Sequence, residues 1–157
     1  MRSFIQTKYI IYTWLWIGAL TTLGCSNSEN PNDTMVYDLI SKGNLYGDGA
    51  EGITQQNMII TTQLSWNALV SQMNTVNNVS DEFENLPIDF TSSTVIAVFD
   101  EVKSNGGYEL ELEISSNQEQ IEIHIISTSP SGNATTVITQ PFIIVKIPKT
   151  DLPIQFQ

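Results

Sequence analysis

Apolar and polar residues alternate over much of the second half of the chain. Residues 108–114 read Tyr-Glu-Leu-Glu-Leu-Glu-Ile, and residues 120–126 repeat the alternation with isoleucines. Successive side chains of a strand point to opposite faces, so the pattern turns one apolar row inward and the glutamates outward. Residues 115–118 supply a turn between the two segments. We therefore predict an antiparallel hairpin.

Further strands are predicted from apolar runs. Residues 95–99 are apolar at every position, as in a central strand buried on both faces. Residues 142–147 form another strand, with Pro141 and Pro148 at its ends. Residues 36–40 and 58–62 are shorter strand-like stretches, and residues 43–52, with four glycines, are predicted to form a loop. The count is about six mostly antiparallel strands.

One segment has helical periodicity. Apolar residues recur at the spacing of a buried helical stripe, with Ser65 as the expected N-cap and Asn77-Asn78 as the expected end; the stripe consists of Trp66, Leu69, Val70, Met73 and Val76. Such a helix covers one face of a sheet. The predicted fold class is α+β, mainly β, with one helix packed on the sheet.

The N-terminal segment has the pattern of a targeting signal. Arg2 and Lys8 precede an uncharged apolar run of about 12 residues, whereas a bilayer span needs about 20. Residues 22–25, Thr-Leu-Gly-Cys, resemble a bacterial lipobox. This resemblance implies that residues 1–24 are a cleaved lipoprotein signal peptide and that Cys25 is lipidated. An uncleaved membrane anchor ending at Cys25 is the alternative.

The rest of the chain divides into a tether and a domain. Residues 25–34 are polar and without periodicity, which predicts a flexible tether. Residues 35–157 contain no repeat and no second linker, so they are predicted to form one β-rich domain.

Charge and composition exclude several function classes. Six Lys and Arg against 17 Asp and Glu give a formal net charge of −11, which opposes binding to nucleic acid and to anionic lipid headgroups. The sequence has one arginine, Arg2, and cleavage of the signal peptide would remove it. Because arginine is the usual residue that binds phosphate through two hydrogen bonds, this argues against a nucleotide site. One Cys and one His exclude an internal disulfide and a Cys-rich or multi-histidine metal site. We expect no cofactor, and membrane attachment through the lipid alone.

Four segments together resemble the PrcB family, the C-terminal domain of a protease-complex subunit. They are residues 87–90 (PIDF), 95–99 (VIAVF), 104–108 (SNGGY) and 140–149 (QPFIIVKIPK). Asn105 stands where the family has Thr, and Phe142 where it has Tyr. The resemblance spans roughly residues 40–149. It implies a small, non-enzymatic, secreted or lipid-anchored domain that associates with a surface protease.

The segment Asn105, Gly106, Gly107 and Tyr108 is the candidate partner-binding loop. Two consecutive glycines permit positive φ or close backbone approach, which predicts a tight connection between strands. The segment is either only a turn or an exposed loop that presents Asn105 and Tyr108 to a partner. A similar Gly-Tyr loop occurs in chagasin-like peptidase inhibitors, so an inhibitor-like domain is a further alternative.

The remaining polar groups support no catalytic site. His124 is predicted on an outward strand face, and no nucleophile motif accompanies it, so the chain is expected not to be an enzyme. Four glutamates are predicted to share the solvent face of the hairpin, either solvated or neutralised by a cation such as Ca²⁺: Glu109, Glu111, Glu113 and Glu122. Residues 48–51 lack calcium-ligand spacing and are predicted to be a turn, so no metal site is assigned.

The function predicted from these observations is that of a lipid-anchored protein of the cell envelope, at the outer membrane. It acts as a non-catalytic protein-interaction module, an accessory or stabilising subunit of an envelope protease complex. The alternative is a surface lipoprotein that binds carbohydrate or Ca²⁺. Carbohydrate binding is disfavoured because Trp66, the one tryptophan left after cleavage, is predicted in the core.

Overall fold

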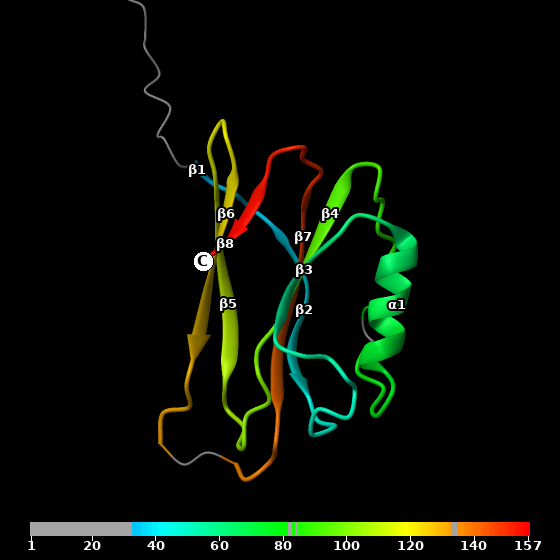
Figure 1. The fold of residues 1–157 in the computed structure, drawn as a ribbon, viewed down its shortest axis with the longest axis vertical. Coiled ribbons are helices and arrows are strands. Elements are labelled where there is room, and N and C mark those ends of the chain that lie inside the picture. The colour runs from blue at the N-terminus through cyan, green and yellow to red at the C-terminus, as the bar shows by residue number, and fades with distance from the viewer. Residues whose placement is uncertain (1–32, 82, 84, 133–134) are drawn as a thin grey trace, which may run out of the picture.

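The structure is a computed structural model that describes residues 33–81, 83, 85–132 and 135–157 (Figure 1). The predicted signal peptide, the lipidation site and most of the tether lie outside the described residues. The elements in chain order are β1 Asp33–Thr34, β2 Asp38–Leu45, β3 Gln56–Ile60, α1 Gln63–Met73, β4 Ser93–Phe99, β5 Glu109–Ser116, β6 Ile121–Thr128, β7 Gln140–Pro148 and β8 Ile154–Phe156.

The strands form two four-stranded sheets. One has the order β1-β5-β6-β8 and the other β2-β7-β4-β3, and every pairing is antiparallel except that of β6 with β8. Helix α1 lies on the side of the second sheet away from the first, so the domain has three layers (Figure 1). The predicted α+β, mainly β class is confirmed. The structure has eight strands in its described part rather than about six, and the two additional strands, β1 and β8, contain only 2 and 3 residues.

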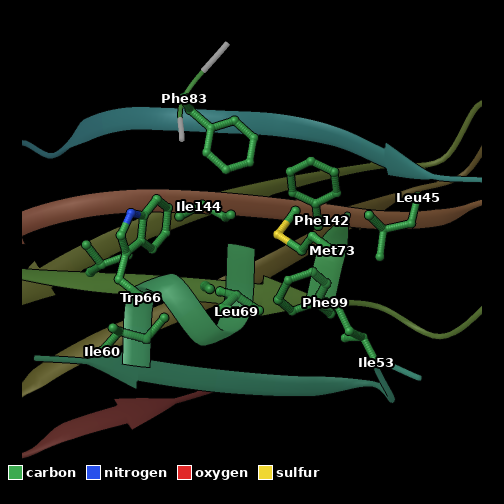
Figure 2. Packing of buried hydrophobic residues seen from close by; sticks show 12 residues of the cluster. Leu45, Ile53, Ile60, Trp66, Leu69, Met73, Phe83, Phe99, Phe142 and Ile144 are labelled. Carbon is green, nitrogen blue, oxygen red and sulfur yellow. The ribbon is translucent and has the colours of Figure 1, made fainter. Parts of the chain in front are cut away.

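Sheet β2-β7-β4-β3 is the middle layer and contributes to two cores. Along β4, Val95, Ala97 and Phe99 face the helix, while Ile96 and Val98 face the other sheet. Figure 2 shows the helix-side core, in which Met73 of α1 lies beside Phe99, and Trp66 of the same helix belongs to the same cluster. The uninterrupted apolar run of residues 95–99 exists because both faces of β4 are covered.

The helix starts earlier than the sequence indicated. Thr62 is the N-cap, with an extended backbone, and its hydroxyl oxygen accepts a hydrogen bond from the Ser65 N–H at 3.2 Å. The prediction of Ser65 as N-cap was wrong, because the extended backbone that a cap needs occurs at Thr62 and Ser65 already lies in the first turn.

The helix also ends earlier. Its C-cap is Asn74, whose side-chain oxygen accepts hydrogen bonds from the N–H groups of Val79 and Ser80 at 3.1 and 3.2 Å. These bonds bend the following chain back onto the helix end. Val76 therefore lies beyond the helix and is 46% exposed, contrary to its predicted place in the buried stripe.

Three other boundaries differ from the predictions. Strand β2 continues through Gly43 to Leu45, into the predicted loop, because the whole segment pairs with β7. Strand β3 spans Gln56–Ile60, so it starts and ends two residues earlier than the predicted stretch of residues 58–62. Asp33–Thr34, assigned to the tether, pair with β5.

The predicted hairpin is confirmed as β5 and β6, with Ile114 opposite Ile123. Leu110, Leu112 and Ile114 are buried, whereas Glu109, Glu111 and Glu113 are exposed. In the part of the chain that the structure describes, no helix is long and apolar enough to cross a membrane.

Candidate functional site

The predicted Asn-Gly-Gly-Tyr loop lies in the connection between the two sheets. Residues 100–108 lead from β4 in the middle sheet to β5 in the other sheet, so the segment is a crossover and not a tight turn between paired strands. Its partner is the segment before β7. Lys103 and Thr139 exchange backbone hydrogen bonds of 2.7 and 3.0 Å, and the Gly106 N–H donates to the Thr135 carbonyl at 3.0 Å.

Both glycines are required by close packing. Gly106 is buried, and a Cβ there would overlap the Thr135 hydroxyl. Gly107 has φ +92°, and a Cβ there would lie 2.8 Å from the Pro130 Cβ. Asn105 and Tyr108 are half-buried, less exposed than a free loop would leave them. The crossover is thus a packed connection that leaves part of the Asn105 and Tyr108 surface accessible.

A lysine that sequence reasoning had not singled out organises this crossover. The Lys103 ammonium lies 3.1 Å from Asp100 Oδ2, 2.9 Å from Glu101 Oε1 and 5.1 Å from the centre of the Tyr108 ring. Burial lowers the pKa of Lys103, but its hydrogen bonds to Glu101 and Asp100 outweigh burial, so the pKa lies above its ordinary value. Lys103 therefore stays charged and holds the Tyr108 ring by a cation–π contact.

Asp100 is the polar centre of the crossover. It is 9% exposed, and its carboxylate accepts from the Glu101 N–H at 2.7 Å and the Ser127 hydroxyl at 3.1 Å, in addition to the lysine. Gln140 completes the arrangement, since its side-chain amide donates to the carbonyls of Ile53 and Asp100, both at 2.9 Å. These bonds link the ends of β4, β6 and β7, so the role of the cluster is structural.

The glutamate row of β5 is partly neutralised by a lysine from the other sheet. Lys42 of β2 lies 3.1 Å from Glu109 and 3.6 Å from Glu111. The hydrogen bond to Glu109 is the main reason that the pKa of Lys42 is raised. His124 is exposed, as predicted, and lies opposite Glu113 across the hairpin. The positive charge beside Glu109 and Glu111 thus comes from Lys42, which could not be predicted from the sequence pattern of the hairpin because it belongs to another strand.

Trp66 and the loop of residues 47–52 are the groups that bear on the carbohydrate and calcium alternatives. Trp66 is 1% exposed and packs on Phe83 with ring centres 6.0 Å apart, so it offers no platform for a sugar. Residues 47–52 form two successive turns, through bonds from Ala50 N–H to Gly47 and from Gly52 N–H to Gly49. Within the described ranges, no three His, Cys, Asp or Glu side chains gather as metal ligands.

The fold and the crossover define a small three-layer domain whose two sheets are joined by a packed glycine-containing connection. Residues 94–148, from β4 through β7, match the PrcB C-terminal family. This part of the chain is therefore similar to the PrcB C-terminal domain, and the resemblance seen in the sequence is confirmed over these residues. The match includes the crossover and Gln140 but not β2 or α1. No curated protein and no solved structure gives a significant match to the chain.

Proposed function

We propose that this protein is a non-catalytic, lipid-anchored subunit that associates with a protease complex in the cell envelope, at the outer membrane. The observation that carries the proposal is the PrcB C-terminal match over residues 94–148. These residues contain the whole crossover and the hairpin that follows it, so the matched segment includes Lys103, Asp100 and Gln140.

A binding role rather than a catalytic one is supported by the state of the ionisable groups. The Asp100 carboxylate is occupied by a lysine, a hydroxyl and a backbone N–H. His124 lies exposed on a strand, opposite a glutamate. A general acid or base needs a proton partner in reach of a substrate, whereas these groups are either engaged in folding or solvated.

The accessible part of the crossover is the proposed contact. The Tyr108 side chain is held by Lys103, and the backbone of Asn105 is held because its carbonyl accepts a hydrogen bond from the Thr139 hydroxyl at 3.0 Å. A side chain that is already held in place loses little conformational entropy when a partner packs on it. The rigid crossover therefore suits Asn105 and Tyr108 for recognition.

The test is crosslinking in the native cell envelope followed by affinity capture. The wild type is compared with N105A/Y108A and with a matched double variant on the exposed face of the helix, Q63A/L64A. We expect one specific protease to be captured by the wild type and by the helix variant but lost with N105A/Y108A. Failure of all three folded proteins to capture a specific protease would overturn the proposal.

Lipid anchoring is tested separately at Cys25. Metabolic labelling with an alkyne fatty acid is expected to label the wild type, which then fractionates with the outer membrane. Cys25→Ser is expected to lose the label and to leave the outer-membrane fraction. A Cys25→Ser protein that remains in the membrane would favour the uncleaved anchor instead.

A further inference from the structure

The two sheets have four edge strands, and these are protected unequally. β1 and β8 contain 2 and 3 residues. β2 has an irregular register between Leu39 and Ser41 and carries Lys42, and bulges and lysines both discourage the addition of another strand. The short edges and the irregular edge are thus poor templates for a fifth strand.

β3 has none of these protections. Its five residues, Gln-Asn-Met-Ile-Ile, include no charge and no proline. They pair with β4 in continuous register, from Gln56 opposite Phe99 to Ile60 opposite Val95. Within the described residues β3 ends its sheet, so its outer side presents unpaired backbone N–H and C=O groups.

The surface beside β3 is suited to side chains of an added strand. A groove of about 360 Å³ lies between β3 and the other sheet, and its lining is mixed, with the apolar Val98, Leu110 and Ile125 beside polar residues that include Gln56 and Asp100. Asn57 lines this groove, and Ile59 lies on the same face of β3 because side chains alternate along a strand. Ile59 is 45% exposed, although Ile96 opposite it is fully buried. The apolar surface between the two sheets therefore extends from Ile96, which is buried, to Ile59, which is exposed.

The charge of the chain indicates which segment would bind. The formal net charge is −11. Each lysine of the described part is already engaged by an acid or a carbonyl; these are Lys42, Lys103, Lys146 and Lys149. The surface field is thus acidic, which attracts a cationic partner and opposes pairing with a second copy of the same chain.

We propose that β3 is the docking edge for an extended, cationic segment of a partner protein, which adds to the sheet as a fifth strand and places apolar side chains over Ile59 and in the adjacent groove. Main-chain hydrogen bonds would supply affinity and the groove would supply selectivity. The inference rests on the proposed role as a partner-binding subunit, and it concerns a surface separate from Asn105 and Tyr108.

The probe is a displayed library of random 12-residue peptides, selected on the full chain in detergent. Selected peptides are then measured against I59K and against V76K, which makes the same charge change at a position of matched exposure, 46%, beyond the end of the helix. Circular dichroism verifies that both variants fold. We expect peptides that alternate apolar and basic residues, at least tenfold weaker binding to I59K, and binding to V76K within twofold of wild type.

Backbone pairing is tested with the best peptide in two N-methylated forms, each methylated at one alternate set of amides. One form is expected to lose binding, because only one set of amides faces β3. The proposal is overturned if no peptide is selected, if both variants bind equally, or if both methylated forms bind like the parent. A wild-type dimer in sedimentation that I59K converts to monomer would also overturn it, because a second copy would then occupy the edge.

The envelope capture experiment separates this inference from the proposed function. If I59K still captures the protease, the protease does not bind through β3 and the subunit role stands. If no form of the chain captures a protease while peptides bind at β3, the subunit role fails and the edge remains a binding site.

Discussion

Replacing Gly107 by alanine tests whether the crossover is a packed connection or a simple turn. Gly107 has φ +92°, where an L-residue costs about 1–2 kcal/mol. The new Cβ would also lie 2.8 Å from the Pro130 Cβ, and overpacking of this kind costs about 1–3 kcal/mol. We therefore expect Gly107→Ala to lower the free energy of unfolding by about 2–5 kcal/mol.

Gly132 is the matched control. Its φ is +95°, yet a Cβ there would meet no atom of the described residues within 4 Å, so Gly132→Ala is expected to lower the free energy of unfolding only by the backbone cost of about 1–2 kcal/mol. Urea unfolding followed by far-ultraviolet circular dichroism measures both variants. A gap of about 2 kcal/mol corresponds to a midpoint difference of about 1 M urea if m is about 2 kcal/mol/M. Equal midpoints would refute the packing of Gly107 against Pro130.

Three further predictions concern single side chains. The Glu51 carboxylate is buried without a hydrogen-bond partner among the described residues, so Glu51→Gln is expected to raise the free energy of unfolding in urea by about 1 kcal/mol or more; a lower free energy of unfolding would contradict the lack of a partner. Thr62→Ala removes the N-cap and should cost about 1 kcal/mol in the same assay, whereas Ser65→Ala should cost less if Thr62 is the cap. Hydrogen bonds from the Thr91 hydroxyl and N–H hold the pKa of Asp89 below its ordinary value. The resulting stabilisation is present above the ordinary pKa and is lost as the pH falls through the depressed one. Carboxyl-carbon NMR titration should show a higher Asp89 pKa in Thr91→Val, and an unchanged value would contradict this cause.

Local pattern was sufficient for elements whose environment is uniform along their length. The alternation in residues 109–114 predicted the inward and outward rows of β5, because a strand repeats its faces every two residues. The stripe of Trp66, Leu69 and Met73 likewise predicted α1 and its buried face. The boundaries were less predictable, since Gly43 extends β2 only because β7 lies beside it.

The loop of residues 105–108 was predicted only in part from its sequence. Two consecutive glycines predicted an unusual backbone, and Gly107 does have a positive φ. The sequence could not show that the loop joins different sheets or that Pro130 and Thr135 pack against it. Those contacts join segments separated by more than twenty residues, and no short-range periodicity records them.

The kind of each main element and the face it buries can be read from the chain, because both follow from repeats of two or 3.6 residues. Contacts between distant segments set how the strands divide between two sheets, that Lys42 neutralises Glu109, and that Lys103, Asp100 and Gln140 bond within the crossover and to its neighbours. The tertiary structure also placed β3 at one end of its sheet, with no strand of the described residues on its outer side. A period specifies that a face is covered but not which segment covers it, because that choice depends on packing between residues far apart in the chain.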